Sequence, residues 1–370
     1  MDEYALTEKL IGYDTSAPEG VKLAAGFVKG WLEARDIETM QLEVRDLPVV
    51  YAEVGPPDAP TVLLHGHLDV VPARLGQFDA RVEGDRLYGR GAYDMKGALA
   101  SMLLVLHDLR KQQGVRVRLG IVPDEESEEE ARRGSDRLVE EGFIGDFAIT
   151  GEPTDMHIGV EAKGVLALRL QVGGRAAHGA TPWLGDNAII KALEVFRTIE
   201  SLPFAQQSSE LFDRPSINLG RILGGDALNK VPDTCVIDVD IRYLPTQDPD
   251  AILADVAELK DAELVSSFRR PPAYVDSDSV YVRALCDAAA PHAVDAVTSV
   301  GRDGASDVVS FLRAGVPAVE FGPVGSGHHG PEEWVSIPSL ASYRRTLSDF
   351  IETLPQRLRD SGASVDGGRP

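Results

Sequence analysis

Apolar residues in the first part of the chain follow the patterns of alternating strands and helices. The expected elements are helices at 3–12 and 20–35, strands at 61–69, 115–123 and 146–150, and a long apolar helix at 97–112. The helices repeat apolar residues at helical spacing, and the strand at 115–123 alternates apolar and polar positions. Acids and histidines follow directly after several of these strands. This arrangement is typical of an α/β sheet that builds a site at its strand ends.

The pattern changes after Lys163. Residues 164–174 alternate cleanly, as a half-exposed antiparallel strand does. The elements expected next are a helix at 187–202, strands at 216–225 and 234–244, a helix at 247–260 and a strand at 262–269. This order predicts a compact α+β unit inserted into the chain. A Pro-containing stretch at 269–279 is the expected linker back to the first domain.

The last part of the chain returns to the α/β pattern. Helices are expected at 279–289, 304–314 and 338–358, and a strand at 317–323. We therefore predict a discontinuous α/β domain at 1–162 and 273–360 and an inserted domain at 163–272. The polar, Gly-rich residues 361–370 are expected to form a disordered tail.

The composition is that of a soluble globular protein, with 43% hydrophobic and 26% charged residues in a chain of 370. A formal net charge of −22 disfavours binding to nucleic acid or to anionic membranes. We find no apolar run long enough to cross a bilayer and no signal-peptide pattern at the start. The two cysteines, Cys235 and Cys286, form no CxxC pattern, which excludes a disulfide scaffold and favours the cytoplasm.

Five separated segments place acids or histidines at strand ends or helix starts. They are HGHLD at 65–69, GRGAYDMKG at 89–97, DEES at 124–127, TGEPT at 150–154 and GSGHHGPEEW at 325–334. In an open α/β sheet such positions converge on one crevice. Histidines together with several carboxylates suit zinc, cobalt or manganese. Each segment alone has an ordinary structural explanation, such as a hydrogen-bonded His–Asp pair or a solvated helix start, so the prediction depends on their combination.

These segments also carry a family resemblance. Together with AAHGATPWLGDNAI, GGDALNKVPDTCVIDVDIR and HGPEEWV, they resemble the zinc-dependent amidohydrolase and exopeptidase family of acetylornithine deacetylase, succinyl-diaminopimelate desuccinylase and carboxypeptidase G. The resemblance covers nearly the whole chain. It implies an α/β catalytic domain with a mixed, mostly parallel sheet flanked by helices, plus an inserted α+β lid and dimerisation domain. It also implies two divalent metal ions, with zinc preferred to cobalt or manganese.

The resemblance implies a set of five metal ligands. They are His67, Asp94, Glu126, Glu152 and His329, with Asp94 bridging the two metals and one His and one carboxylate completing each site. The peptide bond between Asp94 and Met95 is expected to be cis. His329 is preferred to His328 because it stands four residues before Glu333, as the family pattern requires.

Glu125 resembles the catalytic carboxylate of the family. A water held between two cations loses its proton easily, and Glu125 would take that proton and pass it to the leaving nitrogen. Asp69 would accept the second ring N–H of His67 and so fix the orientation of the ring. His65 has no ligand role in the pattern. The glutamates at 128–130 match nothing in it and are expected at a solvated helix start.

The inserted domain resembles the family's lid. His178 corresponds to a histidine that, in a homodimer formed through this domain, polarises the scissile carbonyl in the neighbouring site. A histidine that only caps the adjacent helix is the alternative. Asn229 and Arg242 match positions that recognise the carboxylate of the substrate, and Gly225 would let the backbone come close.

The substrate expected is a small N-acyl amino acid. Desuccinylase-like members tend to carry Arg-Gly-Ser at the start of the lid, whereas this chain has Lys163, Gly164 and Val165. The leading hypothesis is therefore acetylornithine deacetylase-like hydrolysis of an N-acyl amino acid. A dipeptidase, a carboxypeptidase or the desuccinylase itself would use the same site. A non-catalytic metal- or amino-acid-binding protein is the alternative of another class, and the unliganded Glu125 argues against it.

Overall fold

The computed structural model describes residues 1–127 and 132–362 of the chain. They divide into two compact units, the first made of 1–127, 132–160, 275–300 and 306–362, and the second of 161–274 and 301–305. We call the second the inserted unit. Sequence predicts its start at 163 and its end at 272, and does not predict that 301–305 join it. The glutamates at 128–130 and most of the expected tail lie outside the described residues.

The first unit is built on a mixed sheet whose central strands are parallel. The strands of this sheet are β1 (Thr39–Val44), β2 (Leu47–Val54), β3 (Thr61–His67), β6 (Arg116–Val122), β7 (Phe147–Thr150), β8 (Ile158–Ala162), β13 (Ala273–Tyr274), β14 (Ser299–Arg302) and β15 (Ala318–Glu320). Of these, β13 and the last two residues of β8 and β14 fall within the residue ranges of the inserted unit. The strand order of the sheet is β1-β2-β6-β3-β7-β15-β8-β13, and β14 pairs with β8. The pairs β6–β3, β3–β7 and β7–β15 are parallel, and the flanking pairs β1–β2, β2–β6, β15–β8 and β8–β13 are antiparallel.

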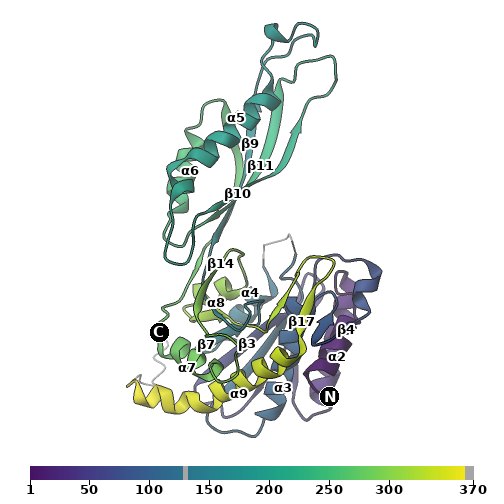
Figure 1. Ribbon diagram of the computed structural model, residues 1–370, viewed down its shortest axis with the longest axis vertical. Coiled ribbons are helices and arrows are strands. Elements are labelled where there is room, and N and C mark those ends of the chain that lie inside the picture. Colours follow the sequence, from purple (N-terminus) through teal and green to yellow (C-terminus); the bar gives the residue numbers. More distant parts are fainter. Residues whose placement is uncertain (128–131, 363–370) are drawn as a thin grey trace. The chain divides into compact units, whose positions relative to one another are not determined.

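Helices cover the sheet of the first unit (Figure 1). They are α1 (Glu3–Ile11), α2 (Pro18–Glu33), α3 (Gly97–Asp108), α4 (Gly134–Glu140), α7 (Val280–Ala289), α8 (Val308–Arg313) and α9 (Ile337–Asp360). Every residue of α3 from Gly97 to Leu106 is buried, because α3 packs between β3 and the helices α1 and α9. A Cβ on Gly66 of β3 would lie 2.6 Å from Cε of Met95, so the start of α3 sits directly on the end of this strand.

A small second sheet in the first unit brings the loop before α9 beside the turn before α3. It joins β4 (Arg81–Glu83), β5 (Arg86–Tyr88), β16 (Gly325–Ser326) and β17 (Trp334–Ser336) in the order β16-β17-β5-β4. Trp334 pairs with Tyr88, although the two are far apart in sequence. These strands have two or three residues each, which is too short for a periodic pattern, and sequence does not predict them.

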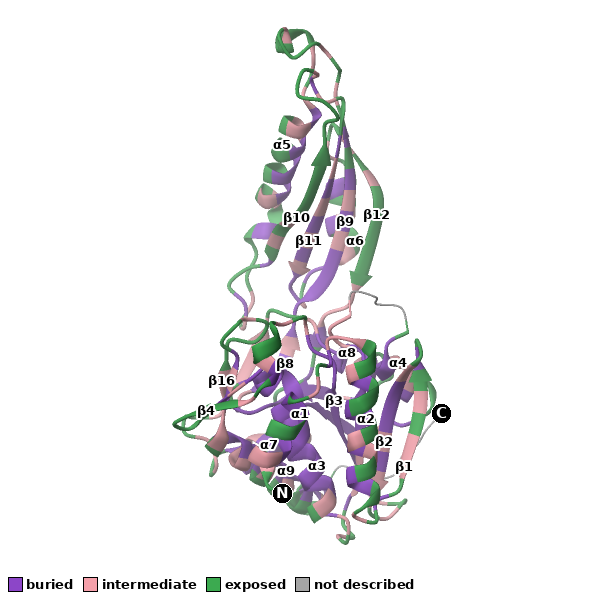
Figure 2. Cartoon of the chain, turned by 90° about the vertical axis from the view of Figure 1, so that its right-hand side faces the viewer, coloured by how far each residue is buried: buried purple, intermediate pink, exposed green. Residues whose placement is uncertain are grey.

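The inserted unit is one antiparallel sheet with two helices. Its strands β9 (Gly164–Gly173), β10 (Ser216–Gly224), β11 (Thr234–Tyr243) and β12 (Ala262–Arg270) have the order β10-β11-β9-β12, and its helices are α5 (Ala188–Ser201) and α6 (Pro249–Ala257). The inner strands β9 and β11 alternate buried and partly exposed residues, as predicted for 164–174. The edge strands β10 and β12 are mostly exposed (Figure 2).

The structure differs from the expected elements at two further places. The hairpin of β1 and β2 is absent from the predicted elements, and its two-residue turn is Arg45–Asp46, both at positive φ without a glycine to mark the turn. The helix expected at 304–314 begins only at Val308. None of the helices in the described part of the chain combines the length and the apolar character that a bilayer crossing requires.

Candidate metal centre

The strand order of the first unit brings the expected metal ligands to one edge of the sheet. His67 is the last residue of β3, Glu126 follows β6, and Glu152 follows β7. Because β6, β3 and β7 are parallel neighbours, their carboxyl ends lie side by side. Asp94 precedes α3, which packs against β3, and His329 lies between β16 and β17.

Four of the five side chains form a tight cluster around Asp94. Its Oδ1 lies 3.2 Å from Nε2 of His67, and its Oδ2 lies 3.4 Å from Nε2 of His329. The same Nε2 of His329 lies 2.9 Å from Oε1 of Glu126. Each oxygen of Asp94 therefore faces a different histidine, which is the arrangement of a bridging carboxylate. The peptide bond between Asp94 and Met95 is cis, which confirms that prediction.

Glu152 is buried at the same edge and lacks a partner for one oxygen. Its Oε1 accepts no hydrogen bond among the described residues. Burial raises the pKa of Glu152 well above its ordinary value, and the negative charge of Asp94 adds to this. A buried carboxylate oxygen without a donor is costly, and a cation would supply the missing partner. Glu152 is not part of the group in which His67, Asp94 and Glu126 place ligand atoms within 4.8 Å of one another.

The donor set fits a site for divalent cations. Two imidazoles and three carboxylates are ligands that zinc, cobalt and manganese accept. Hydrogen bonds to Asp94 and Glu126 raise the pKa of His329 to about 10. The pKa of Asp94 is lowered: its burial opposes this, but hydrogen bonds from His329 and His67 outweigh it. The histidines thus stand in a strongly negative environment that attracts cations.

Asp69 acts differently from the expectation. The Nδ1–H of His67 donates to the backbone carbonyl of Asp69 at 2.9 Å, and the carboxylate Oδ1 is farther, at 3.4 Å. Because a carbonyl can only accept, this bond places a proton on Nδ1, and Nε2 is the ring nitrogen that faces the cluster. The carboxylate of Asp69 instead accepts the backbone N–H groups of Glu125 and Glu126, at 3.1 and 2.8 Å. Asp69 therefore holds the ring through its backbone and the glutamate turn through its side chain.

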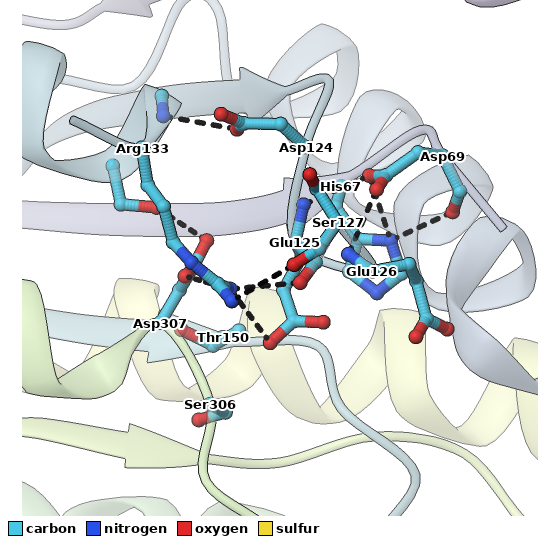
Figure 3. A network of polar contacts seen from close by, with 12 residues as sticks. His67, Asp69, Asp124, Glu125, Glu126, Ser127, Arg133, Thr150, Ser306 and Asp307 are labelled. Atoms are coloured by element: carbon cyan, nitrogen blue, oxygen red, sulfur yellow. Dashed lines mark hydrogen bonds and ion pairs between the residues drawn. The ribbon is translucent and has the colours of Figure 1, made fainter. Parts of the chain in front are cut away.

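Glu125 lies beside the cluster and is held by residues that sequence reasoning missed (Figure 3). Nη1 of Arg133 donates to the backbone carbonyl of Glu125 at 2.7 Å and lies 3.4 Å from its Oε1. The same Nη1 lies 3.4 Å from Oδ1 of the fully buried Asp307. Burial raises the pKa of Glu125 to about 8, and the charge of Asp307 contributes. A carboxyl group with a raised pKa can accept and return a proton near neutral pH.

The two other histidines near the cluster, His65 and His328, contact other side chains. His65 is fully buried, with its ring between the hydroxyls of Thr150 and Ser135 at 3.3 Å each and edge-on to Phe311. Burial lowers the pKa of His65 to about 4, so the ring is neutral. The ring of His328 packs against Tyr93, with centroids 5.9 Å apart.

The residues expected in the inserted unit fall into two places. His178 forms a bridge with Lys230, and the N–H of Gly179 donates to the backbone carbonyl of Asn229 at 2.7 Å. Arg242 lies eight residues along β11 from Thr234, which is the strand end on the His178 side. At about 3.3 Å per residue this is about 26 Å. Gly225 follows β10 with φ +80°, a conformation that favours glycine.

His178 does not cap a helix. Its Nδ1 accepts the backbone N–H of Ala180 at 3.0 Å, so the proton of the neutral ring sits on Nε2. The side chain is exposed. His178 therefore presents an N–H donor to its surroundings.

The match to known proteins covers most of the chain. Residues 63–353 match the model of peptidase family M20/M25/M40. The chain belongs to this family. It is a metallohydrolase of the M20 group that acts on amide bonds, and it has the fold class predicted from its sequence.

Two relatives similar to the chain in sequence carry desuccinylase names. A succinyl-diaminopimelate desuccinylase of Caulobacter sp. (strain K31) is 27% identical over 385 residues, covering 96% of this chain and 95% of the relative. A protein of Mycobacterium tuberculosis (strain CDC 1551 / Oshkosh) named as a putative succinyl-diaminopimelate desuccinylase is 33% identical over 278 residues, covering 71% of this chain and 73% of the relative.

Solved M20 structures share the fold. A tripeptidase from Staphylococcus aureus has a TM-score of 0.79 at 21% identity, covering 96% of this chain and 98% of that chain. A metallo-carboxypeptidase from Sulfolobus solfataricus has a TM-score of 0.78 at 19% identity, covering 96% and 100%.

Proposed function

We propose that this M20 hydrolase cleaves the amide bond of N-acyl amino acids with the help of two divalent metal ions. His67 and Glu152 would hold one ion, Glu126 and His329 the other, and Asp94 would bridge them. The observation that carries this proposal is the cluster of His67, Asp94, Glu126 and His329 with Glu125 beside it. Zinc is the preferred metal, with cobalt or manganese as alternatives.

The bound cations would polarise the amide carbonyl and make a water molecule acidic. Glu125 would accept a proton from that water and deliver it to the leaving nitrogen. Asp69 would keep Glu125 and Glu126 in register through its two hydrogen bonds to their backbone N–H groups. Arg133 would keep the Glu125 carboxylate in place.

We propose that His178, Asn229 and Arg242 contact the substrate from two copies of the chain. The Nε2–H of His178 suits an oxyanion, and an arginine fork suits a carboxylate. The Nη groups of Arg242 have no partner within the described residues, while its Nε donates to Asp240 at 2.9 Å. A substrate of amino-acid size cannot span the ~26 Å along β11 that separates the two places within one inserted unit. Together they therefore require a homodimer.

The surface of the inserted unit supports this homodimer. The edge strand β10 is mostly exposed, and an unpaired edge is prone to pairing with another chain. Large apolar side chains are exposed on the segments around His178, including Trp183, Leu184 and Leu228. A twofold contact through this surface would cover them.

The proposal also includes a preferred acyl group on the substrate. Val165 is buried at the start of β9 and offers no hydroxyl to a succinyl carboxylate, which favours an N-acetyl or other short acyl group. The names of the M20 relatives favour the succinyl group as the second candidate. A dipeptidase or carboxypeptidase would use the same residues. Because both cysteines are free thiols, we place the enzyme in the reducing cytoplasm.

A substrate panel tests the proposal. Purified protein loaded with zinc or cobalt is assayed on N-acetyl amino acids, N-succinyl amino acids and dipeptides. We expect the highest kcat/KM on an N-acetyl amino acid with a free carboxylate. Highest kcat/KM on N-succinyl substrates would establish the second candidate. Metal binding without turnover of any panel member would contradict the proposal and favour a binding protein.

A further inference from the structure

Glu333 connects two of the segments that carry the proposed metal ligands. We infer that Glu333, supported by Arg90, is a positioning residue that sets the affinity of the centre for its metals. It touches neither a metal nor a substrate in this role, and it acts through Asp94 and His329. The inference rests on the proposed function, because it assumes that these two side chains bind cations.

The carboxylate of Glu333 receives four donors. Its Oε1 accepts the backbone N–H groups of Tyr93 and Asp94, at 3.0 Å each. Its Oε2 accepts the N–H of Gly91 at 3.0 Å and Nη1 of Arg90 at 2.6 Å. Glu333 is 1% exposed. Three backbone amides of one turn and one guanidinium thus converge on one buried side chain, which therefore determines the path of the turn that ends at Asp94.

Arg90 connects the turn at 91–94 to the loop that carries His329, and we call Glu333 and Arg90 together the clamp. Its Nη2 donates to the backbone carbonyl of Gly330 at 3.1 Å, and Nε2 of Gln77 donates to the same carbonyl at 3.0 Å. Gly330 is the neighbour of His329, which itself adopts φ +61°. The pair Glu333–Arg90 therefore fixes both the residue at the centre of the cluster and one of the histidines that flank it.

This arrangement needs a carboxylate and not merely a side chain of that size. Both oxygens of Glu333 face N–H donors, and an amide would place its own NH2 group against one of them. Two of the four hydrogen bonds would be lost, and at least one buried backbone amide would remain without an acceptor. Residues that orient metal ligands in this way typically change metal affinity 10- to 100-fold when mutated. We therefore expect the effect of Glu333→Gln to appear in metal binding first.

The test measures zinc affinity of the full-length apoprotein by competition with a chromophoric chelator. The variants are Glu333→Gln and Arg90→Lys. The matched control is Glu332→Gln, because Glu332 is exposed and pairs only with Arg81 at 2.9 Å among the described residues. We expect about 10- to 100-fold weaker binding for Glu333→Gln and about 10-fold weaker binding for Arg90→Lys. Glu332→Gln should bind as the unmodified protein does. The absorption spectrum of the cobalt-loaded protein should change in the two clamp variants and not in the control.

The outcomes separate this inference from the proposed function. If the unmodified protein binds no divalent cation, the proposed function fails. If the unmodified protein binds zinc and Glu333→Gln has the same zinc affinity and cobalt spectrum, the inference about Glu333 is wrong while the proposed function stands. Should Glu333→Gln not fold, Arg90→Lys decides, because it keeps the three backbone hydrogen bonds of Glu333 and loses only the guanidinium fork. Unchanged affinity in Arg90→Lys would then overturn the inference.

Discussion

The candidate metal centre and the inserted unit hold their proposed functional residues in different ways. At the candidate metal centre, residues from separate segments of one folded unit are hydrogen-bonded to one another, as Asp69 is to Glu125 and Glu126, and all of them except His329 are buried or half-buried. In the inserted unit, His178 and Asn229 are exposed and held by local backbone contacts. The first arrangement is complete within one chain. The second has donors that face outward, which is what a site shared between two copies requires.

Loss of the proposed base, Glu125, should have the largest effect on turnover. Glu125→Gln keeps the shape of the side chain and removes its ability to accept a proton. We expect turnover to fall about 10²- to 10⁴-fold, the usual contribution of a general base. Zinc content and unfolding temperature should stay the same, because Asp69 binds the backbone N–H of Glu125 and not its side chain. Rate measurements on variants with verified zinc content check this.

An exposed acid serves as the control for Glu125→Gln. Glu43→Gln on β1 changes an exposed residue and should leave turnover unchanged. If Glu125→Gln keeps more than a tenth of the activity, another group is the base and the role of Glu125 must be reassigned.

Loss of His178 should have the next largest effect. Removing one oxyanion donor typically costs about 10²- to 10³-fold in turnover, so His178→Ala should lose activity to that extent while its zinc affinity is unchanged. A 1:1 mixture of His178→Ala and Glu125→Gln subunits should recover up to about a quarter of the normal activity. Half of the dimers are then mixed, and each mixed dimer has one site with both residues intact.

The mixing experiment requires proof that subunits exchange. Two affinity tags allow the mixed dimers to be isolated before the assay. Inactive mixed dimers would show that His178 acts on its own chain's site or on none. A fully active monomer in dilute solution would contradict the shared site altogether.

Substitution of Arg133 tests whether the residues that hold Glu125 in place contribute to turnover. Arg133→Ala removes the contacts to the backbone carbonyl of Glu125 and to Asp307. Because small displacements of a catalytic group reduce rates strongly, we expect kcat to fall about 10- to 100-fold with little change in KM. Guanidine added to the assay should restore part of the rate. Arg137→Ala is the control, since Arg137 pairs with Glu140 on the exposed surface of α4. Equal kcat in both variants would reduce Arg133 to a packing role.

The sequence predicted the candidate site residues that lie at strand ends. It did not predict the residues whose role depends on contacts between distant segments of the chain. His67 ends one apolar strand, and Glu126 and Glu152 follow two others, so a parallel sheet brings them to the same edge. Glu333 entered only as a marker of spacing for His329, because nothing in HGPEEWV indicates that its carboxylate binds the turn at 91–94. Arg133 and Asp307 are 174 residues apart. Such pairs become visible only once the chain is folded.

Arg242 should give the smallest effect and the most specific one. An arginine binds a carboxylate through two parallel hydrogen bonds, and a lysine supplies only a point charge. We expect Arg242→Lys to raise KM about tenfold for substrates with a free carboxylate, which corresponds to about 1.4 kcal/mol, with kcat nearly unchanged. The matching amide substrate, which has no carboxylate, should be hydrolysed equally by both proteins. Arg169→Lys is the control, because both Nε and Nη2 of Arg169 are bound to Asp238. If KM for the carboxylate and the amide rises by the same factor, Arg242 shapes the inserted unit and does not recognise the substrate.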